Sequence, residues 1–184
     1  MDPKEAFTLD DVFAPVPLYL TLLWARPGRR TREVVGLIRD AADHTPDLDD
    51  RIRQLVEDRN WRAVLVACGL LVMGHGRRPG IDDALWARLD PYHWAAPQLA
   101  GTLSVLDPDF DVHAATRLDC EDDPLSTKSA LALRGRLPGH PHRARWQRRY
   151  GDGRPELGFV EGLAQDWVER VQAALEPGEP GPEG

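Results

Sequence analysis

The stretch that decides the fold reads Trp61-Arg62-Ala63-Val64-Leu65-Val66-Ala67-Cys68-Gly69-Leu70-Leu71. It is apolar on nearly every side of a helix, so it predicts a central helix over residues 61–73 that other helices cover all around. Three further helices of similar chemistry are expected to begin at residues 31, 94 and 127, so the spacings are 30, 33 and 33 residues. A period of this length predicts repeated helix pairs, because each pair buries its apolar face against the next.

Small residues recur inside these stretches. Seven positions after Arg62 and after Lys128 comes a glycine, Gly69 in the one case and Gly135 in the other. Small and apolar residues at such places let one helix stack closely on its neighbours. Shorter helices are expected before the stretches, and those over residues 48–59 and 81–89 carry an Asp-Asp pair in the first turn, where the helix macrodipole favours acids.

The stretches that begin at residues 61 and 127 resemble the second helix of HEAT-like repeats, in which a basic residue near the helix start is followed by alanines and then a Leu-Gly step. The resemblance covers roughly residues 31–137. It departs from the family pattern at Ala95, which replaces the basic residue, and at Gly36, where a larger residue is usual. It implies a short right-handed α-solenoid of stacked antiparallel helix pairs, with an irregular helical bundle as the alternative.

Helical periodicity recurs along the chain and strand-like alternation is absent, which predicts an all-α fold in a single domain over residues 1–175. Helices are expected over residues 18–25, 31–42, 48–59, 61–73, 81–89, 94–106, 112–118, 127–137 and 156–175. The last of these is apolar on one face, so we expect it to cap the open end of the solenoid, while residues 16–24 cap the other end. Residues 176–184 are rich in Pro, Gly and Glu and predict a disordered tail.

Composition limits the cellular context. The chain has 184 residues and a net charge of −7. Its two cysteines, Cys68 and Cys120, belong to no C-x-x-C pair, so they predict free thiols and a cytoplasmic protein. The first residues lack the pattern of a signal peptide. The longest apolar run, residues 63–73, is too short to span a bilayer, and we expect no membrane partner.

Signatures of catalysis are missing. The chain carries no G-x-S-x-G, Walker A, H-E-x-x-H or G-x-G-x-x-G motif, so it predicts no catalytic residue and no cofactor, although residues that meet only in the fold could still form a site. Residues 107–111 alternate acids like a calcium loop, but Val112 and Leu118 occupy positions that need Gly and Glu. His140 and His142 have no further ligand nearby, so no metal site is predicted.

An acidic segment over residues 107–123 is the first candidate binding surface. It holds seven acids and a single basic residue, Arg117. One interpretation is a solvated loop rim, and the other is a patch that binds a basic protein partner. The acids proposed for that partner are Asp107, Asp109, Asp111, Glu121, Asp122 and Asp123.

An arginine-rich segment over Arg134–Arg154 is the second candidate. It holds seven arginines and one acid, a local charge of +6, and the rest of the chain carries −13. A helix over residues 142–150 would place arginines on one face, where guanidinium groups can bind phosphate or carboxylate. The candidate anion-binding residues are Arg143, Arg145, Arg148 and Arg149, with Trp146 among them. Alternatively, these arginines pair with the protein's own acids, such as those of residues 107–123, and Trp146 packs in the core.

Three functions are compatible with these patterns. The preferred one is a non-catalytic protein-binding module, such as an adaptor or a bacterial immunity or antitoxin-like protein that binds a basic, co-encoded partner. The alternative is nucleic-acid binding through Arg134–Arg154, because some HEAT-like proteins resemble DNA glycosylases. The third is an enzyme or small-molecule binder with a groove lined by Trp61, Tyr92, His93 and Trp94, although core packing explains the two tryptophans more simply.

Overall fold

The computed structural model describes residues 8–13, 18–76, 79–89, 94–120, 122, 125–150 and 158–176. Every regular element in these ranges is helical, which confirms the all-α prediction. The elements in chain order are the 3-10 helix η1 (Leu9–Phe13) and the α-helices α1 (Tyr19–Trp24), α2 (Arg29–Asp43), α3 (Leu48–Glu57), α4 (Trp61–Val72), α5 (Ile81–Arg88), α6 (Ala96–Leu106), α7 (Phe110–Asp119), α8 (Thr127–Arg136), α9 (Arg143–Tyr150) and α10 (Gly158–Ala173). The predicted tail lies outside these ranges except for Glu176.

Local sequence signals explain where several helices begin. The side chain of Asn60 accepts a hydrogen bond from the backbone N–H of Arg62 at 3.1 Å and so caps α4. Ser126 caps α8 in the same way through the N–H of Ser129, at 3.2 Å. Pro97 lies in the first turn of α6, where its missing N–H breaks no bond within the helix.

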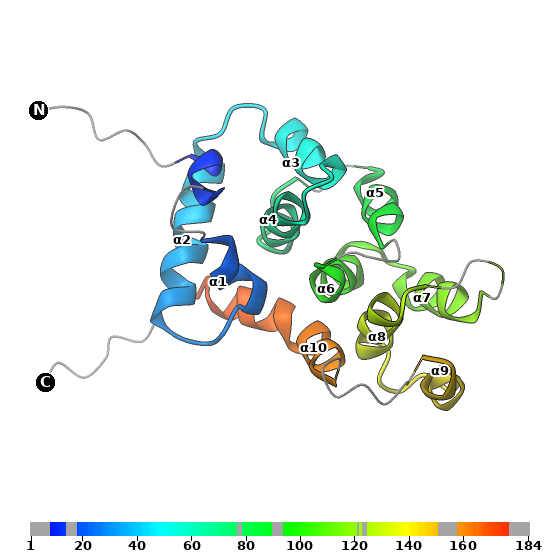
Figure 1. Ribbon diagram of the computed structural model, residues 1–184. Coiled ribbons are helices and arrows are strands. Elements are labelled where there is room, and N and C mark those ends of the chain that lie inside the picture. Colours follow the sequence, from blue (N-terminus) through cyan, green and yellow to red (C-terminus); the bar gives the residue numbers. More distant parts are fainter. Residues whose placement is uncertain are drawn as a thin grey trace, which may run out of the picture.

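The helices form stacked pairs (Figure 1). Helices α3, α5 and α7 lie on the outer side, and their partners α4, α6 and α8 form an inner row in which α6 contacts both neighbours. Every residue of α4 from Ala63 to Val72 is buried, which confirms the prediction of a central, fully covered helix. Helix α1 packs against α2 and α4, and so lies at the α4 end of the row.

Helix α10 is placed differently from the sequence-based expectation. Instead of capping one end of the stack, it packs along the inner row against α8 and α6 and reaches α4 and α1 (Figure 1). The buried indole N–H of Trp167 donates to the carbonyl oxygen of Leu22 in α1 at 2.8 Å. The prediction of an end cap is therefore wrong, because the apolar face of α10 is buried against the middle of the row. Helix α10 thus covers the inner row of the stacked pairs, as a helix in a bundle would. The HEAT-like resemblance stays a prediction.

Glycines allow the close approach of α10. A Cβ atom on Gly135 of α8 would lie 2.6 Å from the carbonyl oxygen of Glu161 and 3.0 Å from its Cα. On Gly101 of α6 it would lie 3.0 Å from a methyl group of Val168. The first contact is with backbone, which cannot rotate away, so α8 and α10 meet at Gly135 without an intervening side chain. This confirms that small residues permit close helix stacking.

We predict that Gly135→Ala lowers the free energy of unfolding by about 1–3 kcal/mol, because the added methyl group must push two helix backbones apart. Gly162→Ala in α10 is the matched control, since a Cβ there meets nothing within 4 Å. Its higher helix propensity should stabilise the protein by up to about 1 kcal/mol. Urea unfolding followed by circular dichroism measures both changes. Equal stabilities of Gly135→Ala and the wild type would contradict the close approach.

Candidate functional site

Asp107 is buried, contrary to the expectation that it lies on an exposed acidic rim. Its carboxylate accepts hydrogen bonds from the indole N–H of Trp86 at 2.8 Å, from Nδ1 of His113 at 2.7 Å and from the backbone N–H of Asp109 at 2.9 Å. Burial alone would raise the pKa of Asp107, but these hydrogen bonds outweigh it and hold the pKa below its ordinary value. Asp107 therefore joins α5 to the start of α7 and is not available to a partner.

His113 is the exposed member of this network. Its hydrogen bond to Asp107 raises the pKa of the imidazole above the ordinary value, and the nearby charges of Asp109 and Asp82 act in the same direction. The ring also meets Trp86 edge-on, with centroids 6.1 Å apart.

The other acids of the rim divide into two groups. Asp109, Asp111 and Asp122 are exposed, as predicted. Glu121 and Asp123 lie outside the described residues. The described part of the acidic surface therefore lies at the start of α7 and just beyond its end.

Asp119 joins the acidic segment to the arginine-rich segment. Its carboxylate accepts a hydrogen bond from the indole N–H of Trp146 at 2.6 Å, and it pairs with Arg145 and with His142. Burial by itself would raise the pKa of Asp119, but the hydrogen bonds from Trp146, Arg145 and His142 lower it below the ordinary value. Trp146 is completely buried. The indole and its carboxylate partner thus fix α9 against the end of α7.

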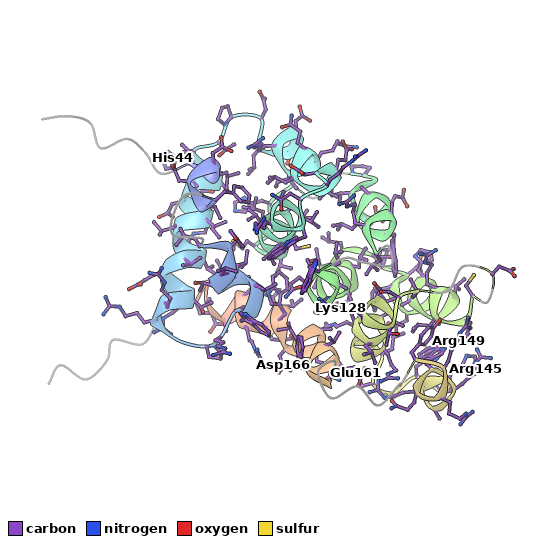
Figure 2. All side chains as sticks on the ribbon, in the orientation of Figure 1. His44, Lys128, Arg145, Arg149, Glu161 and Asp166 are labelled. Atoms are coloured by element: carbon purple, nitrogen blue, oxygen red, sulfur yellow. The ribbon has the colours of Figure 1, made fainter. Side chains whose placement is uncertain are left out.

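Most of the candidate anion-binding arginines have partners within the protein. Arg149 donates to the carbonyl oxygen of Cys120 at 2.7 Å, just beyond the end of α7, and Figure 2 shows Arg145 and Arg149 on α9 near α7. Arg143 donates to Glu161 of α10 at 3.3 Å and to the carbonyl oxygen of Arg134 at 2.7 Å.

Two further arginines of this segment, Arg134 and Arg148, differ in their environment. The buried Arg134 forms an ion pair with the same Glu161. Arg148 is exposed and forms no hydrogen bond or ion pair with any described residue. The interpretation in which the arginines pair with the protein's own acids is therefore confirmed for Arg134, Arg143 and Arg145, and Trp146 packs in the core as that interpretation expects.

The structure exposes an aromatic surface that includes Trp94, which was expected to pack in the core. It consists of Leu20, Trp24, Trp94 and Phe159, which are 44%, 39%, 67% and 47% exposed. The rings of Trp24 and Phe159 lie 5.6 Å apart, and both residues line one pocket together with Trp94 and Trp61. Trp94 was expected to pack between repeats like Trp61, but α6 begins two residues later, at Ala96, so its side chain lies outside the helix stack.

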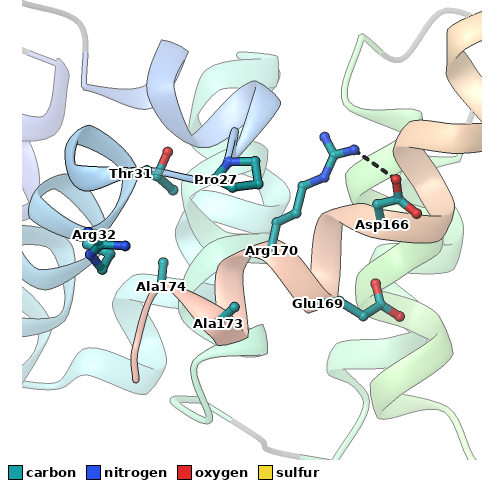
Figure 3. A pocket seen from close by; sticks show the side chains of 9 residues that line it. Pro27, Thr31, Arg32, Asp166, Glu169, Arg170, Ala173 and Ala174 are labelled. Atoms are coloured by element: carbon teal, nitrogen blue, oxygen red, sulfur yellow. Dashed lines mark hydrogen bonds and ion pairs between the residues drawn. The ribbon is translucent and has the colours of Figure 1, made fainter. Parts of the chain in front are cut away.

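Two further hollows adjoin the aromatic surface. One is lined by residues of α1, by the turn that follows it and by the first three residues of α2, Arg29, Arg30 and Thr31. The next, of about 370 Å³, shares Pro27, Gly28 and Thr31 with it and lies between α2 and the end of α10 (Figure 3). In this second hollow Arg170 pairs with Asp166 at 2.8 Å. The three hollows therefore form one continuous surface from Trp94 to Arg170.

The charges on this surface are mainly positive. The guanidinium of Arg26 lies 5.9 Å from the ring centroid of Trp24, and the ammonium of Lys128 lies 4.8 Å from that of Trp94. Burial lowers the pKa of Lys128. Eight charged residues line the three hollows. Six of them are basic, Arg26, Arg29, Arg30, Arg32, Lys128 and Arg170, and two are acidic, Asp166 and Glu169.

The described part of the chain shows neither a metal-binding cluster nor a membrane-spanning helix. Within it, no three His, Cys, Asp or Glu side chains gather closely enough to hold a metal ion. None of its helices combines the length and apolar character that a bilayer crossing requires. Cys68 is buried, and burial raises the pKa of its thiol to about 12. Tyr92 and His93, expected in a groove with the tryptophans, lie outside the described residues.

Comparison of the chain with protein-family models, with curated proteins and with solved structures found no match. By its fold and its site, the chain is an all-α protein of stacked helix pairs with an exposed aromatic surface.

We predict that Asp119→Ala lowers the free energy of unfolding at neutral pH by about 1–3 kcal/mol, because the buried indole N–H of Trp146 loses its acceptor. The pKa of Asp119 is lowered by folding, so the stability contributed by its ionised form is complete above the unfolded pKa of about 3.9 and is lost as the pH falls through the folded pKa. The difference between variant and wild type should therefore shrink below about pH 4. Urea unfolding across pH measures it, with the exposed Asp111→Ala as control; a difference that stays constant with pH would contradict the ionic role.

A second prediction concerns His113. Its imidazole should titrate above the ordinary pKa of about 6.5 in an NMR titration, and Asp107→Asn should bring the pKa down because the ionised hydrogen-bond partner is gone. Since folding raises the pKa of His113, the associated stability is present below the unfolded pKa and is lost as the pH rises through the folded one. Asp111→Asn is the control. An unchanged His113 titration in folded Asp107→Asn would refute the pairing.

Proposed function

We propose that this protein is a non-catalytic protein-binding module and that the aromatic surface is where its partner binds. The observation that carries the proposal is the exposure of Trp24, Trp94 and Phe159 around one pocket. Tryptophan is enriched among the residues that contribute most to protein interfaces, because it buries a large area with little loss of side-chain entropy. A contiguous exposed apolar patch bordered by charged residues is typical of such interfaces.

The charge of the surface favours an acidic partner. Six basic and two acidic residues line the three hollows, and two of the basic residues, Arg29 and Arg170, already pair with Glu33 and Asp166. The uncompensated guanidinium groups would attract carboxylates of a partner and speed its association. This proposal differs from the sequence-based expectation of a basic partner, which stays a prediction; of the acids proposed for that partner, Asp107 is buried.

An adaptor role and an immunity or antitoxin-like role are both compatible with this surface. The exposed Asp109, Asp111 and Asp122 would instead bind a basic partner. The experiments below compare this acidic surface with the aromatic surface as the binding site. Nucleic-acid binding through Arg134–Arg154 is the weaker alternative, because Arg134, Arg143, Arg145 and Arg149 have partners inside the protein.

The test begins with the protein that co-purifies with the tagged chain from its native host. Once that partner is purified, its affinity for Trp94→Ala should fall by about 30-fold or more, as expected for a residue central to an interface. Trp94 is 67% exposed, so its removal leaves the core intact. Isothermal titration calorimetry measures the loss. Val112→Ala on α7, where the side chain is 64% exposed and lines none of the three hollows, is the matched control.

A triple variant separates the two candidate surfaces. Changing Asp109, Asp111 and Asp122 to Asn should leave the affinity unchanged if the aromatic surface is the interface. Loss of binding in the triple variant, with full binding in Trp94→Ala, would overturn the proposal in favour of the acidic rim. Recovery of nucleic acid alone, with a binding constant that falls steeply with salt, would also overturn it.

A further inference from the structure

The described part of the chain ends beside a hollow that carries an uncompensated positive charge. Helix α10 ends at Ala173, and both Ala173 and Ala174 line the hollow of about 370 Å³ between α10 and α2. Figure 3 shows Ala174 at the end of α10 and Arg32 on α2, both at this hollow. Residues 176–184, the Glu-Pro segment, therefore begin two positions beyond its lining.

Arg32 is the basic residue of this hollow whose charge is uncompensated. It is exposed and forms no hydrogen bond or ion pair with any described residue. The other charged lining residues already have partners, because Arg170 pairs with Asp166 at 2.8 Å and Glu169 pairs with Arg136 at 3.2 Å. The hollow therefore offers one guanidinium group to a further anion, while each of its two carboxylates lies beside a cation.

The positive charge continues into the adjoining hollow at the start of α2. This hollow is lined by Arg26, Arg29 and Arg30. Arg29 pairs with Glu33 at 2.6 Å, whereas Arg30 forms no hydrogen bond or ion pair with any described residue. Together with Arg32 these arginines carry four positive charges, and Glu33 contributes one negative charge, so the local charge is +3. A stretch of chain that carries negative charge would therefore be attracted to the start of α2.

The Glu-Pro segment has the complementary charge. It carries three glutamates, Glu176, Glu179 and Glu183, and no basic residue, so its charge is −3. Its three prolines fix the φ angle at their positions and so reduce the entropy that is lost when the segment is ordered. Because the segment is joined to α10 beside the hollow, its effective concentration there is high, and a few exposed ion pairs suffice to hold it for a substantial part of the time.

We propose that the Glu-Pro segment binds back across the start of α2, with the carboxylates of Glu179 and Glu183 beside the guanidinium groups of Arg32 and Arg30. It then covers the basic hollows and leaves the aromatic pocket around Trp94 open. The consequence for binding rests on the proposed function: an acidic stretch of the partner has to displace the Glu-Pro segment before it reaches the arginines.

Paramagnetic relaxation enhancement measures this contact in the full chain. A nitroxide on Gly181→Cys in a Cys120→Ser background labels the Glu-Pro segment, and the buried Cys68 stays unlabelled. The amide signals of residues 28–32 should broaden. Glutamine in place of both glutamates of the proposed contact should reduce that broadening by about 2-fold or more, and so should about 0.5 M sodium chloride, because both weaken the ion pairs.

Two controls separate binding from tethering. The amides of Ala173 and Ala174 lie near the attachment point whether or not the segment binds, so their broadening should change less than that of residues 28–32. A mixture of chains that carry the nitroxide and isotope-labelled chains that do not reports contacts between copies. In this mixture the signals of residues 28–32 should stay sharp.

Charge exchange assigns the contact to residues. Arg32→Glu should reduce the broadening of residues 28–31, and the further changes Glu179→Arg and Glu183→Arg should restore it, because the charges are then complementary again. Arg53→Glu on α3 is the matched control and should change nothing, because Arg53 is exposed and lines none of the three hollows. All these side chains are at the surface or in the Glu-Pro segment, so the variants keep the core intact.

Three results would overturn the contact. Broadening of residues 28–32 that neither the glutamine variant nor salt reduces is explained by the tether alone. Equal broadening in the mixture of chains assigns the hollow to the same segment of a second copy. Absence of charge-dependent broadening, with partner affinity lost in Arg32→Glu, assigns the hollow to an acidic stretch of the partner.

The partner of the proposed function tests the competition. Glu179→Gln combined with Glu183→Gln should raise its affinity about 2-fold or more, as expected when the segment occupies the hollow for half of the time. Unchanged affinity, with the contact present, overturns the competition and keeps the contact. An unchanged affinity of Trp94→Ala for the partner, with the contact present, overturns the proposed function and keeps the contact.

Discussion

Helix α10 lies against the backbone of α8 at Gly135 and crosses the inner row of the stacked pairs, and this contact organises the rest of the molecule. Its Trp167 donates to Leu22 and so positions α1. Its Glu161 pairs with Arg134 of α8 and with Arg143 at the start of α9, and so joins both helices to α10. Because α1 and the start of α10 are placed together, Trp24 and Phe159 meet at the surface and form part of the aromatic wall.

The protein's two oppositely charged segments illustrate how internal pairing removes apparent binding sites. Trp146 donates a hydrogen bond to Asp119, and Arg143, Arg145 and Arg149 around it donate to carboxylate or carbonyl oxygens of the same chain. Guanidinium groups with satisfied donors have little left to offer a phosphate. The aromatic surface differs, because Trp24, Trp94 and Phe159 remain between 39% and 67% exposed despite their contacts within the protein.

Local signals in the sequence predicted every α-helix of the described residues except α9, and long-range contacts explain most of what was missed. The cap at Ser126, the proline in the first turn of α6 and the apolar character of α4 each act within a few residues. The burial of Asp107 depends on Trp86, and the placement of α10 depends on Leu22 and Gly135, all far away in the sequence. The exposure of Trp94 follows from a shift of two residues in the start of α6, which periodicity does not resolve.

The hydrogen bond from Trp167 to Leu22 joins residues 145 positions apart. In an open array of helix pairs each unit contacts only its neighbours, so folding can spread from any point along the chain. Here the earliest α-helix completes its contacts only after the last one has been synthesised. Such a chain should fold as one cooperative unit after its C-terminal helix leaves the ribosome, and more slowly than an array of local contacts of the same length.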